Sequence, residues 1–248
     1  MEKFTIMTVW NDESMFRQLQ ENLAGQTGVE YVLLGIDNRG NPYPGIRQAF
    51  LDHLDQVDTS LVLFAHQDIR FLEAEDLAHF VAQVEKLENL GVAGVAGCPA
   101  GSQWQLLSNI VHGKNRTPAG KTISAPQSVQ SVDECLFAMR LSTLRKLPFT
   151  NRPGWHLYAV EQCIQSQQAG LTNYVVPAQL YHLSSGGSLD PSYLTMLTAM
   201  CKTYNISHLN TTVKQWQPGT FSGRCYISYY YLKQKMKRFL LKKGLMKG

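Results

Sequence analysis

The strongest candidates for chemistry in this sequence are a histidine and an acid that directly follow a short apolar run. His66-Gln67-Asp68 comes after residues 61–65, all five of which are apolar. A carboxylate at the end of a buried strand suits Mg²⁺ or Mn²⁺, because such an ion keeps coordination sites open for a diphosphate. An aspartate that caps the next turn would occupy the same place. Position alone supports both interpretations of Asp68 equally.

Polar side chains also follow other apolar segments of the first hundred residues. Continuous apolar strands that alternate with amphipathic helices indicate an α/β fold, with a mostly parallel central sheet flanked by helices. Ligands of such sheets bind at the carboxyl ends of the strands, where Asn11, Asp37 and Asp68 are expected. The predicted elements are strands over 4–9, 31–36, 60–65 and 91–97, a helix that ends near residue 23, and helices over about 46–54 and 74–89.

The stretch 98–126 breaks this pattern. Gly, Ser, Asn, Thr and Pro dominate it, and a loop of this length inside a compact domain is more often functional than passive. Its basic residues Lys114, Arg116 and Lys121 predict a lid that assists a charged donor after binding. Solvated loop charges are the alternative. After it the predicted elements are a strand over 128–140, a helix over about 155–169, a strand over 174–176 and a helix from about 190.

Five segments resemble, in their order and spacing, the bacterial family-2-like glycosyltransferases with the GT-A fold. The resemblance extends over roughly residues 3–190. It implies a GT-A catalytic sheet in which His66-Gln67-Asp68 occupies the place of the family's D-x-D motif. The matching segments are 66–69 (HQDI), 92–97 (VAGVAG), 132–140 (VDECLFAMR), 155–163 (WHLYAVEQC) and 181–186 (YHLSSG).

The resemblance implies a metal site. Asp68 corresponds to the metal-binding acid, and His182 corresponds to a later histidine that supplies another ligand. Because His66 replaces the first acid of D-x-D, the pair Asp68 and His182 is expected to suit Mn²⁺ better than Mg²⁺, which prefers oxygen ligands. A partly buried histidine bonded to backbone is the alternative for His182.

The resemblance also implies a nucleoside diphosphate sugar as the donor, with a UDP-sugar as the first candidate. Asn11 and Asp37 correspond to positions that contact the nucleoside in the wider family. His66 and Asp68 are expected beside the diphosphate. The donor would therefore lie across the carboxyl ends of the first three strands.

For the transfer step, the family's catalytic acid falls on Glu161. We expect Glu161 to be the general base that takes the proton from the acceptor hydroxyl. Asp133 and Glu134 are the next candidates for this base. The alternative for Glu161 is an acid on the solvent-facing side of its helix, with no catalytic role. Trp155 and His156 are expected to frame the acceptor, because aromatic faces bind the apolar faces of sugar rings; ordinary packing is the alternative for Trp155.

The charge of the chain is unevenly distributed. The net charge is +4, yet seven basic residues and no acid lie between Cys225 and the last residue, so the rest of the chain carries a charge of −3. This pattern argues against a nucleic-acid partner for the body. The basic segment 226–247 also contains aromatic residues and leucines, which predicts contact with an anionic membrane. A helix packed on the body or used in a dimer is the alternative.

We therefore predict a catalytic domain over 1–210, with a nucleotide-binding half (1–97) and an acceptor half (98–210), and a basic C-terminal helical extension over 211–248. The sequence begins without a signal-peptide pattern, and its five cysteines form no C-x-x-C pair, which favours a cytoplasmic protein with reduced thiols.

The predicted activity is an inverting, metal-dependent hexosyl- or N-acetylhexosaminyltransferase of polysaccharide or glycan assembly, with a glycan or lipid-linked acceptor. A nucleotidyltransferase and a degenerate, non-catalytic nucleotide-sugar-binding module are the alternatives.

Overall fold

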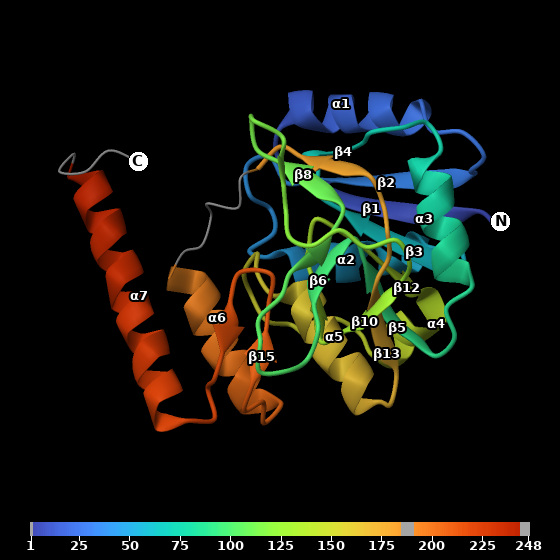
Figure 1. Cartoon of the computed structure of the whole chain (residues 1–248). Coiled ribbons are helices and arrows are strands. Elements are labelled where there is room, and N and C mark those ends of the chain that lie inside the picture. Colours follow the sequence, from blue (N-terminus) through green and yellow to red (C-terminus); the bar gives the residue numbers. More distant parts are fainter. Residues whose placement is uncertain (1, 185–190, 244–248) are drawn as a thin grey trace.

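Seven strands form the central sheet of the computed structural model, which describes residues 2–184 and 191–243 (Figure 1). Five strands run in one direction, while β12 and β10 run antiparallel to their neighbours. The predicted α/β fold with a mostly parallel sheet is confirmed, as a mixed sheet. In order across the sheet, the strands are β10 (Gln127–Val129), β13 (Thr172–Val175), β5 (Leu90–Gly94), β12 (Leu136–Arg140), β3 (Leu61–Ala65), β1 (Phe4–Trp10) and β2 (Tyr31–Asp37).

Helices cover both faces of this sheet. Along β3, alternate side chains enter different apolar clusters, as the two-residue period of a strand requires: Leu63 packs with α1 and α3, and Phe64 packs with α2 and α5. In Figure 1, α1 and α5 accordingly lie on opposite sides of the strands. The helices are α1 (Glu13–Ala24), α2 (Ile46–His53), the short 3₁₀ turn η1 (Leu54–Gln56), α3 (Asp76–Glu85), α4 (Leu141–Lys146) and α5 (Tyr158–Gln168).

A second sheet crosses the carboxyl ends of the parallel strands. The sequence did not predict it, because its strands are only two or three residues long. Strand β14 pairs antiparallel with β4, which places His182 opposite Ile69, and it pairs parallel with β8. In order, this sheet contains β4 (Ile69–Phe71), β14 (Leu180–His182), β8 (Ile110–His112) and β9 (Thr117–Pro118).

Two segments predicted as single strands are each divided. The segment 91–97 divides at Val95 into β5 and β6 (Ala96–Cys98), and β6 belongs to a third sheet with β7 (Leu107–Ser108) and β11 (Ser131–Val132). The segment 128–140 divides into β10, β11 and β12. Between β11 and β12 the chain turns at Asp133, whose Oδ1 accepts a hydrogen bond from the backbone N–H of Cys135 (3.0 Å). This turn places Asp133 and Glu134 at the end of the central sheet.

The C-terminal part packs around its own apolar cluster, which includes Trp216 and the helices on either side of it. Its elements are α6 (Pro191–Thr203), β15 (Leu209–Asn210), β16 (Gln215–Trp216) and α7 (Phe221–Lys242).

The predicted domain boundary after residue 210 falls inside the β15–β16 hairpin. Thr212 at its tip donates a hydrogen bond to Asp133 Oδ2 (2.8 Å), so the hairpin contacts the turn that leads into β12. The predicted basic extension is a helix from Phe221 onward. No helix within 2–184 or 191–243 is long and apolar enough to cross a membrane.

A buried cluster of charges ties α2 to α5. Glu161 on α5 is 1% exposed, and its Oε2 accepts a hydrogen bond from Arg47 Nε (2.9 Å) while its Oε1 accepts one from Arg152 Nε (2.9 Å). The hydroxyls of Thr150 and Tyr204 also donate to this carboxylate, at 3.0 and 3.2 Å. Glu161 therefore has a structural role, because its loss would leave the fully buried Arg47 without its charged partner.

We predict that Glu161→Ala destabilises the fold by about 3–5 kcal/mol, the usual result of removing one partner of a buried ion pair. Urea unfolding followed by circular dichroism measures the loss. The control is Glu88→Ala, which removes an exposed acid and is expected to change stability by less than about 0.5 kcal/mol. Equal stability of the two variants would contradict the structural role of Glu161.

Candidate metal centre and adjoining cavities

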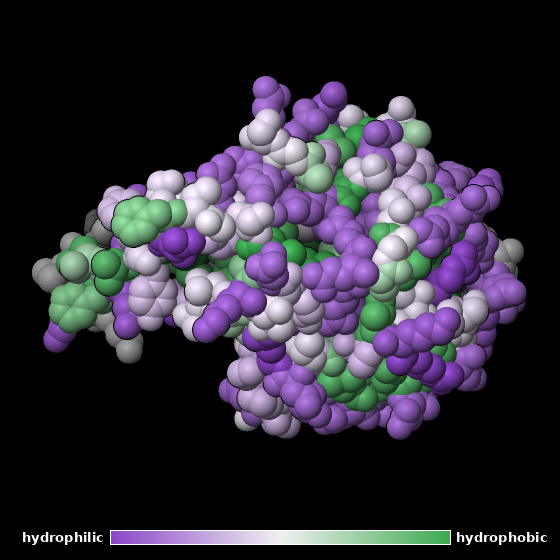
Figure 2. Space-filling model, turned by 90° about the horizontal axis from the view of Figure 1, so that it is seen from below, coloured by the Kyte–Doolittle hydropathy of each residue, from purple (hydrophilic) through white to green (hydrophobic). Residues whose placement is uncertain are grey.

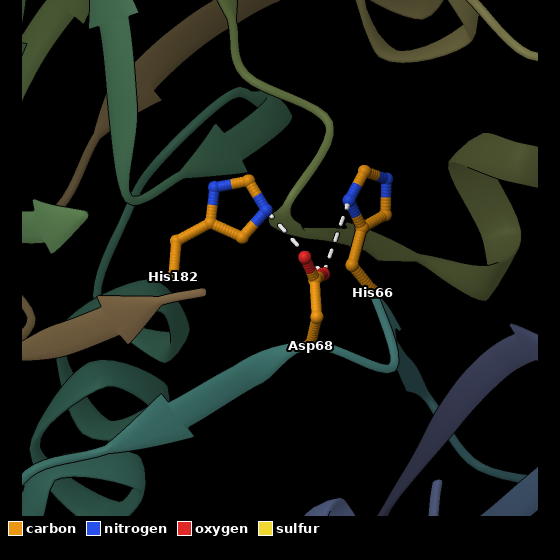
Figure 3. Close-up of side chains that lie close together, drawn as sticks. All are labelled: His66, Asp68 and His182. Carbon is orange, nitrogen blue, oxygen red and sulfur yellow. Dashed lines mark ion pairs between the residues drawn. The ribbon is translucent and has the colours of Figure 1, made fainter. Parts of the chain in front are cut away.

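Three side chains gather where β3 ends and the second sheet begins. Ligand atoms of His66, Asp68 and His182 all lie within 4.8 Å of one another. His182 Nε2 is 3.3 Å from Asp68 Oδ1, and His66 Nδ1 is 3.9 Å from the same oxygen. Figure 3 shows both imidazole rings directed toward the carboxylate.

Backbone pairing holds this cluster together. The N–H of Leu183 donates to the carbonyl oxygen of Asp68 (3.0 Å), which brings the end of β14 against the start of β4. His66 is fixed on its other side, because its Nε2 lies 2.9 Å from the Tyr158 hydroxyl. That hydroxyl in turn donates to the carbonyl oxygen of Glu134 (3.2 Å). The imidazole of His66 is thus held with Nδ1 toward Asp68.

The cluster is electrically polarised. Burial would raise the pKa of Asp68, but its contact with His182 and the charges of both histidines outweigh burial and lower that pKa to about 2. Burial would likewise lower the pKa of His182, but its contact with Asp68 and the negative charges of Asp68 and Asp133 outweigh burial and raise it. Burial, helped by the charge of His182, lowers the pKa of His66. Asp68 therefore stays a carboxylate at neutral pH.

The three side chains fit a divalent transition metal. One carboxylate and two imidazoles suit Mn²⁺ better than Mg²⁺, which takes oxygen ligands almost exclusively. The buried Nε2 of His182 makes no well-aligned hydrogen bond with any described residue, despite its short distance to Asp68. A buried nitrogen in this position is available as a ligand.

Two cavities meet at this cluster. The first has a volume of about 440 Å³ and opens at the carboxyl ends of β1 and β2. The second has a volume of about 230 Å³ and lies toward the β15–β16 hairpin. Four residues line both cavities: His66, Asp68, Glu134 and His156. The cluster therefore stands at the junction of two binding spaces.

Glycine at position 45 helps to place the chain beside this junction. A Cβ atom on Gly45 would lie 2.4 Å from the backbone nitrogen of Gly154, closer than any real Cβ contact. Gly154 itself has a φ of +105°, which side-chain-bearing residues rarely adopt. The close approach positions Trp155 and His156, which follow directly in the sequence.

Two acids of the turn after β11 differ in their electrostatics. Burial, reinforced by the charge of Asp133, raises the pKa of Glu134 to about 8. Its Oε1 accepts a hydrogen bond from the N–H of Tyr158 at the start of α5 (2.7 Å). Burial would also raise the pKa of Asp133, but the charge of His182 and hydrogen bonds from Cys135 and Thr212 outweigh burial and lower it. Neighbouring carboxyl groups with opposite shifts are typical of acid–base sites.

A family model described as a glycosyltransferase-like family matches residues 5–182. This chain belongs to the glycosyltransferase-like family. A protein of Fuscovulum blasticum, named ATP synthase subunits region ORF 6, is 26% identical over 238 residues, which cover 87% of this chain and 85% of that protein.

Three solved structures share the fold of this glycosyltransferase-like protein at low identity. GalNAc-T7, crystallised with UDP, GalNAc and Mn²⁺, matches at a TM-score of 0.57 and 10% identity over 81% of this chain and 47% of its own. S. aureus TarS 1-349, in complex with UDP-GlcNAc, matches at a TM-score of 0.54 and 13% identity over 82% of this chain and 66% of its own. The mannosyltransferase PcManGT from Pyrobaculum calidifontis, with GDP-Man and Mn²⁺, matches at a TM-score of 0.50 and 11% identity over 79% of this chain and 59% of its own.

These likenesses confirm the predicted GT-A fold for this glycosyltransferase-like chain, which spans about half to two thirds of the three solved chains.

The predicted donor residues have different places in the structure. Asn11 lines the larger cavity, as do His66 and Asp68. Asp37 is exposed and is not among the residues that line either cavity. Its carboxylate is instead held by Arg39, which lowers the pKa of Asp37 through hydrogen bonds and charge. The predicted nucleoside contact of Asp37 therefore lacks geometric support.

The predicted catalytic and acceptor residues are also separated. The assignment of Glu161 as general base needs correction, because its carboxylate is buried between two arginines and is absent from the lining of both cavities. Asp133 and Glu134, the next candidates, do line the smaller cavity. His156 lines both cavities, and Trp155 lines only the larger one.

The basic residues of the stretch 98–126 do not reach the site. None of Lys114, Arg116 and Lys121 is among the described residues that line the two cavities. Arg116 instead stacks over the ring of Tyr181, 4.8 Å from its centroid. A lid made of this stretch stays a prediction.

Several residues of the site were not predicted from the sequence. Gln67 lines the larger cavity, where its side chain accepts from the N–H of Asn11 (3.1 Å) and donates to the Asn11 side chain (2.8 Å). Asn38 is 3% exposed and lines the same cavity. His66 was likewise not predicted as a third candidate metal ligand, although its H-x-D spacing from Asp68 at a strand end was an available signal.

We predict that Asp68→Asn and His182→Ala each weaken Mn²⁺ binding at least tenfold. The expectation follows because loss of an outer-sphere partner alone costs about 10- to 100-fold in metal affinity. Electron paramagnetic resonance of free Mn²⁺, recorded without any sugar donor, measures the dissociation constant. His79→Ala, which removes an exposed histidine on α3, is the control and should leave the affinity unchanged. Wild-type affinity in both cluster variants would show that the metal binds elsewhere.

We predict that Glu134→Gln makes the stability of the fold less sensitive to a rise in pH from about 5 to 8. The folded-state pKa of about 8 lies above the ordinary value of 4.5, so the folded protein holds a proton that the unfolded chain releases. The contribution of the Glu134 proton to the free energy of unfolding is fully present below about pH 4.5, and it is lost as pH rises toward 8. Melting temperatures in the presence of a chelator at pH 5 and pH 8 should therefore differ less in the variant. An unchanged pH dependence would contradict the raised pKa.

Proposed function

We propose that the protein is a metal-dependent, inverting glycosyltransferase that moves a sugar from a nucleoside diphosphate sugar, with a UDP-sugar foremost, to an acceptor hydroxyl. The observation that carries the proposal is the His66–Asp68–His182 cluster at the junction of two cavities. One cavity would hold the donor and the other the acceptor. The reacting atoms would then meet beside the cluster, at the carboxyl ends of the strands, where α/β sheets bind their ligands.

The larger cavity suits the donor. It extends from the cluster to Asn11 and Asn38, whose amides offer donors and acceptors for a nucleoside. The diphosphate would lie toward His66, Asp68 and His182, which would hold Mn²⁺. When bound there, the ion supplies positive charge that offsets the charge developing on the leaving nucleoside diphosphate. The chain's own part is to fix the three ligands through β14 and Tyr158.

The smaller cavity suits the acceptor. Its polar lining includes Thr212 from the hairpin and Asp133 from the turn after β11, with Tyr193 from α6. At about 230 Å³ it has room for one sugar ring. A hydroxyl held there would approach the anomeric carbon from the side opposite the leaving nucleoside diphosphate. Attack from that side inverts the configuration of the anomeric carbon.

Glu134 is the general base in this proposal. It lines both cavities, whereas Asp133 lines only the smaller one. A raised pKa makes its carboxylate a stronger proton acceptor, and a group with a pKa near the working pH is the most efficient base. The proton of the acceptor hydroxyl would pass to Glu134 as the oxygen bonds to the anomeric carbon. Asp133, held by Cys135 and Thr212, would orient the acceptor.

The finer assignments rest on the same geometry. An acceptor pocket with room for one ring suits the end of a glycan or of a lipid-linked sugar, as in polysaccharide assembly. We propose a hexosyl or N-acetylhexosaminyl group as the sugar that is transferred. We place this reaction in the cytoplasm. A non-catalytic nucleotide-sugar-binding module is the second candidate, because the cluster holds one carboxylate where D-x-D supplies two.

We predict that Glu134→Gln lowers turnover by about 10²–10⁴-fold, the range that general-base catalysis contributes, while donor affinity changes little. Release of nucleoside diphosphate from UDP-glucose, UDP-galactose, their N-acetylamino forms and GDP-mannose, with Mn²⁺ present, measures turnover. Calorimetry with the best substrate measures affinity. Glu88→Gln is the matched control at an exposed acid.

Wild-type turnover in Glu134→Gln would exclude the residue as base. Tight donor binding by the wild type with no turnover of any sugar, in the presence of glycan acceptors, would instead favour the non-catalytic module.

A further inference from the structure

Helix α7 carries an apolar stripe that points away from the rest of the protein. The stripe repeats every three or four residues, which keeps it on one face of the helix. Phe221, Leu232 and Met236 are exposed to 76%, 63% and 59%. We call this set the outer stripe of α7. It consists of Phe221, Cys225, Tyr229, Leu232, Met236 and Phe239.

The opposite face of α7 already has its packing partners. Ile227 is 7% exposed, and Tyr230 and Tyr231 pack beside it against the C-terminal apolar cluster. The Tyr230 ring lies 6.1 Å from that of Trp216. The helix therefore packs on the protein through its inner face, and this packing does not bury the outer stripe. Figure 1 shows α7 at the edge of the molecule, and Figure 2 shows apolar atoms gathered at that same end.

Charge decides what can cover the outer stripe. All charged residues between Cys225 and Gly248 are basic. The side chains of Lys233, Lys235 and Lys243 are exposed. A second copy of the helix laid on the stripe would bring like charges together, which opposes self-association. The partner must therefore offer an apolar layer that buries the outer stripe and negative charges that bind the lysines.

We propose that the outer stripe of α7 lies in the headgroup layer of an anionic lipid bilayer. Composition predicts membrane contact for 226–247, and the exposed residues between Phe221 and Phe239 indicate the face that would make it. A helix with an apolar face, aromatic residues and a lysine-rich polar surface lies in the plane of the interface. Its 22 residues give a contact about 33 Å long at 1.5 Å per residue. The lysines that flank the stripe would reach the lipid phosphates.

Binding to vesicles tests this proposal on the full chain. We expect cosedimentation with vesicles of phosphatidylcholine containing about 30% phosphatidylglycerol, and at least roughly tenfold weaker binding to phosphatidylcholine alone. The triple variant Leu232→Ser, Met236→Ser, Phe239→Ser should lose at least roughly tenfold in affinity for the anionic vesicles, since burial of its apolar groups is removed. The variant Lys233→Gln, Lys235→Gln, Lys243→Gln should lose affinity and become less sensitive to salt.

A matched control separates the stripe from overall charge. Lys3→Gln, Lys86→Gln, Lys146→Gln removes three exposed lysines of the body and should bind anionic vesicles like the wild type. Equal loss in this control, or equal binding of all variants, would overturn the proposal. So would a wild-type dimer in light scattering that the triple serine variant converts to monomer without any vesicle binding.

The proposal is independent of the activity proposed above. All substitutions in this experiment lie outside the two cavities, so Mn²⁺ affinity measured by paramagnetic resonance should be the same in each variant. Vesicle binding without turnover of any nucleotide sugar would refute the activity and leave the membrane face supported.

Discussion

The site depends on the pairing of two short strands, β4 and β14. The N–H of Leu183 bonds to the carbonyl of Asp68, and the register sets His182 opposite Ile69. A shift of one residue would turn the imidazole to the other face of the strand, because side chains alternate along it. The ion pair between Asp68 and His182 is therefore a consequence of backbone geometry. Because only three residues separate the end of β3 from the start of β4, the same pairing also holds the segment 66–68 in place.

The remaining parts of the site are fixed by the division of a long apolar segment. Residues 128–140 do not form one strand, because the Asp133 side chain accepts from the N–H of Cys135 and turns the chain. The turn brings Glu134 to the start of α5, where Tyr158 donates to it. Tyr158 also contacts His66. One side chain thus links the acid at the junction of the cavities to the histidine of the metal cluster.

The sequence was sufficient for the central sheet because each of its first strands is a continuous apolar run, and the polar residues after these runs marked the ligand edge. It was insufficient for the second sheet, whose strands are too short to show a period. Glu161 shows the other limit. A helical acid near a catalytic segment looks alike whether it faces a cavity or a buried arginine, and Arg47 lies on a helix far away in the sequence. Only the packing of α2 on α5 distinguishes the two cases.

Glu161 and Glu134 illustrate how the fold separates structure from chemistry. Both flank the start of α5, and both are withdrawn from water. Two guanidinium groups, those of Arg47 and Arg152, bond to the carboxylate of Glu161 and make it part of a fixed scaffold. Burial, reinforced by the negative charge of its neighbour Asp133, raises the pKa of Glu134 to about 8. A carboxyl group with a pKa near the working pH that also lines the cavities is suited to proton transfer. Glu161 lines neither cavity, because its oxygens are bonded to the two arginines. Access to the cavities, together with the groups around each carboxylate, therefore decides which acid is suited to proton transfer.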